Sequence, residues 1–147
     1  MGNNAGINLT SGSNNISVGN QSGYSSNNSS DNINIGSQAG YNMQVDYGIN
    51  IGSQAGYNNH TGTHNLNIGY QTGHNATTSN NTINIGYLAG YNDTAGENIN
   101  IGNSAGYNNY NPSITYGQNN INVGNFAGQL NTTGYNNVNI GYNAGKN

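Results

Sequence analysis

The chain has 147 residues and a formal net charge of −3, with a single residue of the Lys/Arg type. This length suits one domain, expected to span residues 1–147. The near absence of Lys and Arg excludes a nucleic-acid-binding surface, which has to neutralise phosphates. The absence of Cys excludes disulfides, thiolate nucleophiles and Cys-based zinc sites. Composition alone, with 37 Asn, 24 Gly and only 22 Ile, Leu and Val, indicates a disordered or prion-like chain, but the order of the residues indicates a fold.

No segment of the sequence is long and apolar enough to cross a membrane, which takes about 18 consecutive apolar residues. The first twenty residues have neither the basic start nor the apolar run of a signal peptide. No membrane insertion is therefore expected, and no secretion signal is recognisable.

A five-residue element, Gly-x-x-small-Gly, occurs nine times between Gly2 and Gly145, mostly at spacings of 16 or 17 residues. Glycine suits both ends of this element because a small coil must turn sharply, and glycine adopts left-handed conformations freely. The small residue between the glycines suits a narrow interior. After the opening element, the first glycine of each is expected at a turn: Gly19, Gly36, Gly52, Gly69, Gly86, Gly102, Gly124 and Gly141.

Each of these turn glycines follows a short segment that alternates apolar, polar and apolar residues. In chain order the segments are residues 16–18, 33–35, 49–51, 66–68, 83–85, 99–101, 121–123 and 138–140. Alternation with a period of two predicts β-strands with one buried face, and β-branched residues suit such a face. The expected core is the aliphatic pair of every strand: Ile16, Val18, Ile33, Ile35, Ile49, Ile51, Leu66, Ile68, Ile83, Ile85, Ile99, Ile101, Ile121, Val123, Val138 and Ile140.

The length of the repeat predicts the fold class. A strand and a turn every 16–17 residues are too short for helical repeats, which need about 33 residues. The sequence therefore predicts an all-β protein, a parallel β-solenoid of about eight coils. Each strand would lie ~4.8 Å from the same strand of the next coil, giving a rod roughly 38 Å long. The chain contains no Asn-Gly pair, the strongest short hairpin signal, and this also favours parallel stacking.

The middle residue of the strands is Ser17 in the first and Asn in all the others. Asn side chains stacked at the strand spacing can bond to one another along the axis, so we expect an Asn ladder on the outer face of the rod. A second column precedes the strands, at Asn15, Asn32, Asn65, Asn98, Asn120 and Asn137, so that this face would read Asn-x-Asn. The ladder itself would consist of Asn34, Asn50, Asn67, Asn84, Asn100, Asn122 and Asn139.

An aromatic residue follows the second glycine of most repeats. This column is a candidate structural ladder, subunit interface or ligand-binding surface, and stacked exposed aromatics could bind the faces of sugars. Its members are Tyr24, Tyr41, Tyr57, His74, Tyr91 and Tyr107. The loops that close the coils are variable and polar, and the longest, at about residues 107–119, is expected to project from the side of the rod.

The ionisable residues offer little for catalysis. The acidic residues are Asp31, Asp46, Asp93 and Glu97. They are scattered over loops and are expected to be solvated, although Asp93 and Glu97 share a loop and could form a carboxylate pair. His60 and His64 also share a loop, but a metal site would need further ligands. We therefore expect no catalytic residue, no metal site and no cofactor, and a protein that is not an enzyme.

The repeat unit, seen in INIGYLAGYN at residues 83–92 and NIGYNAG at residues 139–145, resembles the head repeats of YadA-like trimeric autotransporter adhesins. It is also similar to the Asn-Thr-Ala-Ile-Gly-Tyr-x-Ala-Gly arrays of phage and viral tail-fibre-like proteins. The resemblance covers essentially the whole chain. It implies a left-handed parallel β-roll, commonly trimeric, that serves as a fibre shaft or adhesive head. The chain departs from the family where Asn replaces the small residue between the two Ile.

The expected function is structural: a subunit of an extracellular or virion fibre that self-associates as a trimer, by axial stacking, or both. Uncapped parallel edges at both ends favour axial stacking, and the alternative is a piece of a longer fibre. Two other functions stay open. One is a module that binds ice or a glycan receptor through the Asn-x-Asn face or the aromatic column. The other is a functional amyloid rich in Asn, Tyr and Gly.

Overall fold

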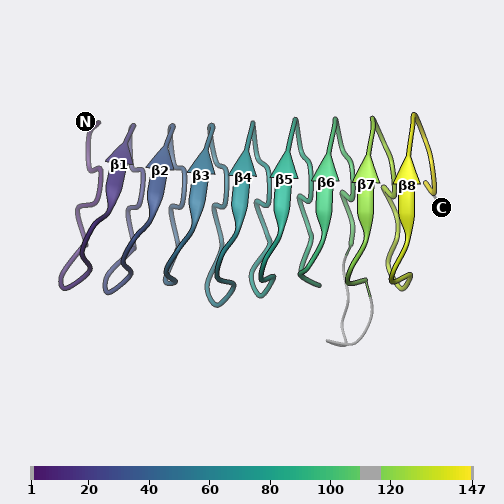
Figure 1. Cartoon of the computed structure of the whole chain (residues 1–147). Helices are drawn as coiled ribbons and strands as arrows, with labels where there is room; N and C mark the ends of the chain where they lie inside the picture. The colour runs from purple at the N-terminus through teal and green to yellow at the C-terminus, as the bar shows by residue number, and fades with distance from the viewer. Residues whose placement is uncertain (1, 110–116, 147) are drawn as a thin grey trace.

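The computed structural model describes residues 2–109 and 117–146, which form eight short β-strands and no helix. The strands follow one another along a straight rod, with the two ends of the chain at opposite ends of it (Figure 1). None of the described residues forms a helix that could cross a membrane. The strands are β1 (Ile16–Val18), β2 (Ile33–Ile35), β3 (Ile49–Ile51), β4 (Leu66–Ile68), β5 (Ile83–Ile85), β6 (Ile99–Ile101), β7 (Ile121–Val123) and β8 (Val138–Ile140).

All eight strands belong to one parallel sheet whose order follows the sequence, from β1 to β8. Equivalent residues of successive repeats are paired, so that Asn34 lies opposite Asn50 and Ile35 opposite Ile51. The same register holds in all seven pairs, including β6 with β7, where the repeat is longest. The predicted fold class, an all-β parallel β-solenoid, is thus confirmed.

The turn glycines hold conformations that side chains rarely adopt. Gly36, the residue after β2, has a φ of +132°. A Cβ atom there would lie 2.5 Å from the carbonyl oxygen of Gly52 in the next coil. The coils therefore approach each other too closely at this corner for any side chain. Gly90, the second glycine of its repeat, has a φ of +57°, and a Cβ there would overlap the side-chain amide of Asn84.

The predicted core is wrong: the strands turn their aliphatic side chains outward and their middle residues inward. Asn50, Asn84 and Asn100 are at most 1% exposed, whereas the Ile residues that flank them are only partly covered. At the ends of the sheet the aliphatic residues are open to solvent, with Ile16 50% and Ile140 68% exposed. None of the residues expected in the core is buried, in either the first or the third position of the strands: Ile16, Val18, Ile33, Ile35, Ile49, Ile51, Leu66, Ile68, Ile83, Ile85, Ile99, Ile101, Ile121, Val123, Val138 and Ile140.

The narrowness of the coil explains this orientation. Ala89 is fully buried, and the wall opposite β5 is formed by Gly90, which leaves room only for the amide of Asn84. An Asn amide has both donors and an acceptor, so stacked copies satisfy one another at the spacing of the strands. An Ile side chain would not fit in this space, and it carries no group that could bond along the axis.

The Asn ladder is present, but inside the rod instead of on its surface. From Asn50 onward, the Nδ2 atom of each Asn donates to the Oδ1 atom of the Asn in the preceding coil. Asn84 donates to Asn67 over 2.9 Å and accepts from Asn100 over 2.8 Å. The remaining bonds, of 2.8 to 2.9 Å, join Asn50 to Asn34, Asn67 to Asn50, Asn122 to Asn100 and Asn139 to Asn122.

The second Asn column is also inside for most of its length, and it ties each coil to the backbone of the next. Asn32, Asn98 and Asn120 are fully buried, and Asn65 is 3% exposed. The Oδ1 atom of Asn98 accepts from the backbone N–H of Asn120 over 2.8 Å. The expected Asn-x-Asn surface is therefore not present on the strand face. The side loop predicted at about residues 107–119 lies largely outside the described residues, which stop at 109 and resume at 117.

Candidate interaction surfaces

The outer face of the sheet is a continuous aliphatic face, made of the sixteen Ile, Leu and Val residues named above. In Figure 1 this face is turned toward the viewer, and no described segment crosses it. Neighbouring side chains in a column cover one another along the axis, so the inner ones are half-buried and those at the ends are exposed. A long apolar face of this kind on a polar rod is a typical feature of an interaction surface.

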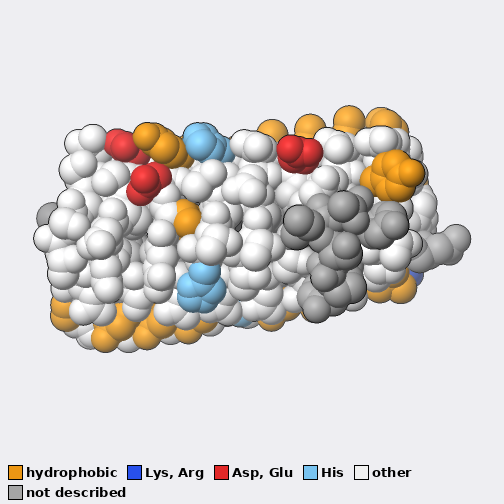
Figure 2. Space-filling view, turned by 90° about the horizontal axis from the view of Figure 1, so that it is seen from below, with side chains coloured by type: hydrophobic (Ala, Val, Ile, Leu, Met, Phe, Trp, Pro, Cys, Tyr) orange, Lys and Arg blue, Asp and Glu red, His pale blue; other side chains and the backbone are white. Residues whose placement is uncertain are grey.

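The face is long, flat and uncharged. Each column adds one aliphatic side chain for every coil, at the spacing of the strands, because the register does not slip between β1 and β8. The rest of the surface carries few charges, and in Figure 2 the hydrophobic side chains gather along the two long edges of the view, with mostly uncharged polar residues between them.

The aromatic column is stacked in six consecutive coils. The ring centroids of Tyr24 and Tyr41 are 4.9 Å apart with an interplanar angle of 3°, and Tyr41 and Tyr57 repeat this geometry. His74 continues the stack at 4.9 Å from both of its neighbours. Tyr91 and Tyr107 close it at 5.1 Å. Each inner ring therefore has its faces covered by other rings, and only the ring edges face sideways.

Burial favours the neutral form of three members of the column, Tyr57, Tyr91 and His74. Burial raises the pKa of Tyr57 and, to a smaller extent, so does the neighbouring phenol of Tyr41. Burial likewise raises the pKa of Tyr91. Burial lowers the pKa of His74, against the opposing effect of its hydrogen bond to Asn75. The inner ring faces are covered by neighbouring rings and are therefore not free to stack on a sugar.

A partly buried amide ladder runs beside the aromatic column. Asn42 donates to Asn58 over 2.9 Å, and the chain of bonds continues through Asn75 and Asn92 to Asn108. A third ladder joins the side chains of Gln38, Gln54 and Gln71. These ladders hold every coil in the same register, which is what keeps the aromatic rings parallel.

Asp93 lies inside the rod, contrary to the expectation that it is solvated. It is fully buried, and its carboxylate accepts from Asn98 Nδ2 over 3.0 Å and from Asn100 Nδ2 over 2.9 Å. Burial raises its pKa to about 6, although the hydrogen bonds from Asn98 and Asn100 oppose the rise. Glu97, by contrast, is exposed, so the two residues do not share one environment as an acid–base pair would.

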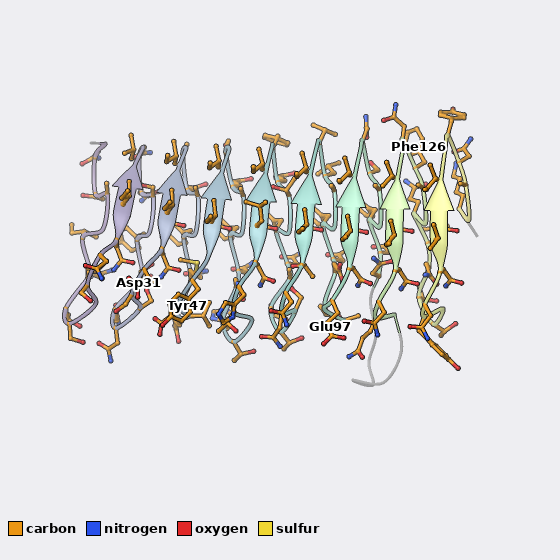
Figure 3. All side chains as sticks on the ribbon, viewed as in Figure 1. Asp31, Tyr47, Glu97 and Phe126 are labelled. Atoms are coloured by element: carbon orange, nitrogen blue, oxygen red, sulfur yellow. The ribbon has the colours of Figure 1, made fainter. Side chains whose placement is uncertain are left out.

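The other ionisable residues do not converge on a site. Asp31 and Glu97 lie along the same loop-side edge of the rod as Tyr47 but several coils apart, and Phe126 lies at the opposite edge (Figure 3). His60 and His64 are exposed, and His64 stacks on Tyr47 at 4.9 Å. Within residues 2–109 and 117–146, no group of three or more His, Cys, Asp and Glu side chains could hold a metal ion.

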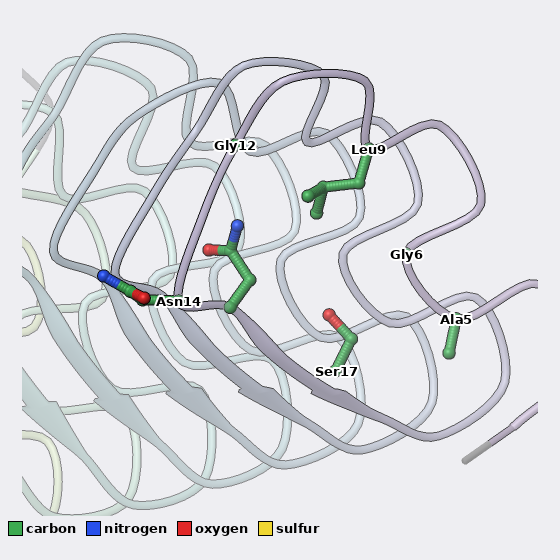
Figure 4. A pocket seen from close by; sticks show the side chains of 7 residues that line it. Ala5, Gly6, Leu9, Gly12, Asn14 and Ser17 are labelled. Carbon is green, nitrogen blue, oxygen red and sulfur yellow. The ribbon is translucent and has the colours of Figure 1, made fainter.

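A hollow of about 380 Å³ opens at the first coil, lined by Ala5, Leu9, Asn14 and Ser17 among others (Figure 4). Ser17 occupies the position that Asn fills in the later coils, and its Oγ atom has no hydrogen-bond partner. The hollow is therefore the open end of the coil interior, where the amide ladder stops.

Comparisons of the chain with protein-family models, with curated proteins and with solved structures give no match.

Proposed function

We propose that the chain is a structural subunit that associates with copies of itself through its aliphatic face to build a fibre. The observation that carries this proposal is the orientation of the strands. The aliphatic side chains that would be the core of an ordinary domain lie on the outside, in two columns of eight residues, while hydrogen-bonded amides fill the inside. Covering such a face removes apolar surface from water, at about 25 cal/mol for every Å².

A second copy is the partner that fits this face best. Another chain presents the same columns at the same axial spacing, so that side chains can interdigitate along the whole length of both rods. The formal net charge of −3 gives little repulsion between copies. The resemblance to trimeric adhesin heads and tail-fibre repeats favours three copies around one axis, and an extracellular or virion fibre as the setting.

The other functions considered from the sequence receive less support. Binding of ice or glycans through Asn-x-Asn would need amides on the strand face, and these amides are buried. Stacking of sugars on the aromatic column would need free ring faces, and the inner rings cover one another. The in-register ladders that an amyloid makes between chains are made here within one chain.

The test is the mass of the protein in solution, measured by light scattering and analytical ultracentrifugation. We expect a discrete oligomer or a longer assembly for the unaltered chain. The double variant Ile85→Lys, Ile101→Lys places two charges in the middle of the aliphatic face and should be a monomer. The matched control Ser37→Lys, Ser53→Lys adds the same charges at exposed corners of the same rod and should assemble normally.

A folded, monomeric unaltered chain at high concentration would overturn the proposal. So would assembly that the two Ile substitutions leave intact while circular dichroism shows a native fold.

A further inference from the structure

The composition leaves this protein few ways to cross-link itself covalently. There is no Cys for disulfides, and the single residue of the Lys/Arg type cannot support a network of amide cross-links. There is no Trp either, so the 12 Tyr residues are the side chains that lose one electron most readily. Met43, which could compete for an oxidant, is fully buried.

The aromatic column brings phenol rings together in a repeated geometry. Tyr24, Tyr41 and Tyr57 are stacked at 4.9 Å with interplanar angles of 3°. Because the coils are in register, each ring is nearly a translated copy of its neighbour. The carbon atom ortho to one hydroxyl therefore lies next to the ortho carbon of the following ring, and the partly exposed ring edges are accessible to small oxidants.

We propose that the tyrosine column is a site of oxidative modification, in which a one-electron oxidant joins neighbouring coils by dityrosine. Each of two adjacent phenols gives one electron to the oxidant and one proton to water, leaving two tyrosyl radicals in contact. The radicals couple through their ortho carbons to form one carbon–carbon bond. Each ring then moves its ortho hydrogen to oxygen and becomes aromatic again. The product has lost two hydrogen atoms, and two equivalents of oxidant have been reduced.

His74 divides the column into two reactive parts. It lies between Tyr57 and Tyr91, in contact with both, so these two phenols are not neighbours. Coupling is therefore expected between Tyr24 and Tyr41 or Tyr41 and Tyr57, and separately between Tyr91 and Tyr107. Tyr70 and Tyr87 at another corner, stacked at 5.4 Å, form a further pair. Each link would close a loop between adjacent coils and restrict the unfolded chain, as a disulfide does.

The positions of the acidic residues allow a direct test. An endoproteinase that cleaves before Asp divides the chain into residues 1–30, 31–45, 46–92 and 93–147. The first fragment contains only Tyr24 and the second only Tyr41. The folded protein is treated with photogenerated tris(bipyridyl)ruthenium(III), then denatured, digested and analysed by mass spectrometry and by dityrosine fluorescence. We expect fragments 1–30 and 31–45 to be joined, with a loss of two hydrogen atoms, in chains that keep the monomer mass on a denaturing gel.

Two variants and one condition sharpen the test. Tyr41→Phe keeps a ring in the stack but removes its phenol, and fragment 1–30 should then lose at least nine-tenths of its cross-link to 31–45. Tyr142→Phe, whose residue is 73% exposed and outside the column, should leave that yield unchanged. In denaturant, fragment 1–30 should join all the other fragments without preference.

The proposal is overturned if the folded protein joins 1–30 to 31–45 no more often than the denatured chain does. It is also overturned if the main product has the mass of two chains, since the column would then react between molecules instead of between coils. The first outcome does not depend on whether the aliphatic face assembles, because its readout is the pair of fragments joined in chains of monomer mass.

Discussion

Asp93 places a carboxylate in the interior of a coil, where amides donate to its oxygen atoms and none of the described residues forms an ion pair with it. Its partners are Asn98, Asn100 and the backbone N–H of Ala95. Burial raises its pKa from 3.8 to about 6, so the folded state holds the proton more tightly than the unfolded state does. Stability should therefore be greatest below about pH 4, fall as the pH rises to about 6, and stay lower above that. The difference corresponds to roughly 3 kcal/mol of unfolding free energy.

Asp93→Asn should remove most of this pH dependence, because an Asn side chain does not titrate. The substitution should fit, since Asn109 occupies the equivalent position of the next coil without a charge. The measurement is urea unfolding of both proteins between about pH 4 and pH 8, a range that covers the fall between the two pKa values and the level reached above about pH 6. We expect the variant to be the more stable of the two at the upper end and similar at the lower end. Parallel curves for the two proteins would show that Asp93 does not carry the effect.

At the scale of the strand and its ladder, the side chain of Asn84 makes two hydrogen bonds, one to Asn67 and one from Asn100. Replacing it by Leu leaves the Oδ1 atom of Asn67 and one N–H of the Asn100 amide without a partner inside the rod, while the other N–H of Asn100 keeps its bond to Asp93. We expect a loss of roughly 2–5 kcal/mol in the free energy of unfolding, since each buried unsatisfied group costs about 1–3 kcal/mol. The control is Asn20→Leu, at an exposed corner, which should change stability by less than about 0.5 kcal/mol. Chemical denaturation at a concentration where the chain is monomeric measures both.

The opposite result would restore the arrangement expected from the sequence. If Asn84→Leu is neutral and Ile85→Asn strongly destabilises the monomer, then the aliphatic residues form the core. The alternation of residues 83–85 fixes which side chains share a face, but it does not say which face is inside. Hydrophobicity decides that question only where the interior is wide enough for aliphatic side chains, and the wall formed by Ala89 and Gly90 is too close.

The sequence nevertheless contained signals for the inward Asn. The middle position of the strand is Asn in seven of the eight strands, whereas the flanking positions interchange Ile, Leu and Val, as positions under weaker packing constraints do. Strand positions, register and turn glycines followed from the period alone, because each repeat must stack on the next. The burial of Asp93 was not expected because its loop has no alternation. Its equivalents in the neighbouring repeats, Ala76 and Asn109, are small or uncharged and are also buried.

At the scale of the whole molecule, the contacts that hold one chain together differ from the contacts proposed between chains. Amide and backbone hydrogen bonds hold the coils of one chain together along the axis, and apolar contact between sheets would hold different chains together side by side. The first does not depend on protein concentration, whereas the second does, because association with a partner stabilises the folded state by mass action. The melting temperature should therefore rise with protein concentration, and this rise should be absent in the double variant Ile85→Lys, Ile101→Lys.

The dependence on salt should identify the force between the chains. Asp93 is buried, so three other acidic residues and one Lys or Arg are left to charge the surface. There is little charge to screen, so sodium chloride up to about 1 M, where the Debye length is about 3 Å, should leave the assembly intact. Sodium sulfate, which is excluded from protein surfaces and strengthens apolar burial, should shift the equilibrium toward the assembled state. Sedimentation velocity at matched ionic strength separates the two salts. Dissociation in sodium chloride would mean that charged loop residues join the copies, and the aliphatic face would then lose its role as the contact between subunits.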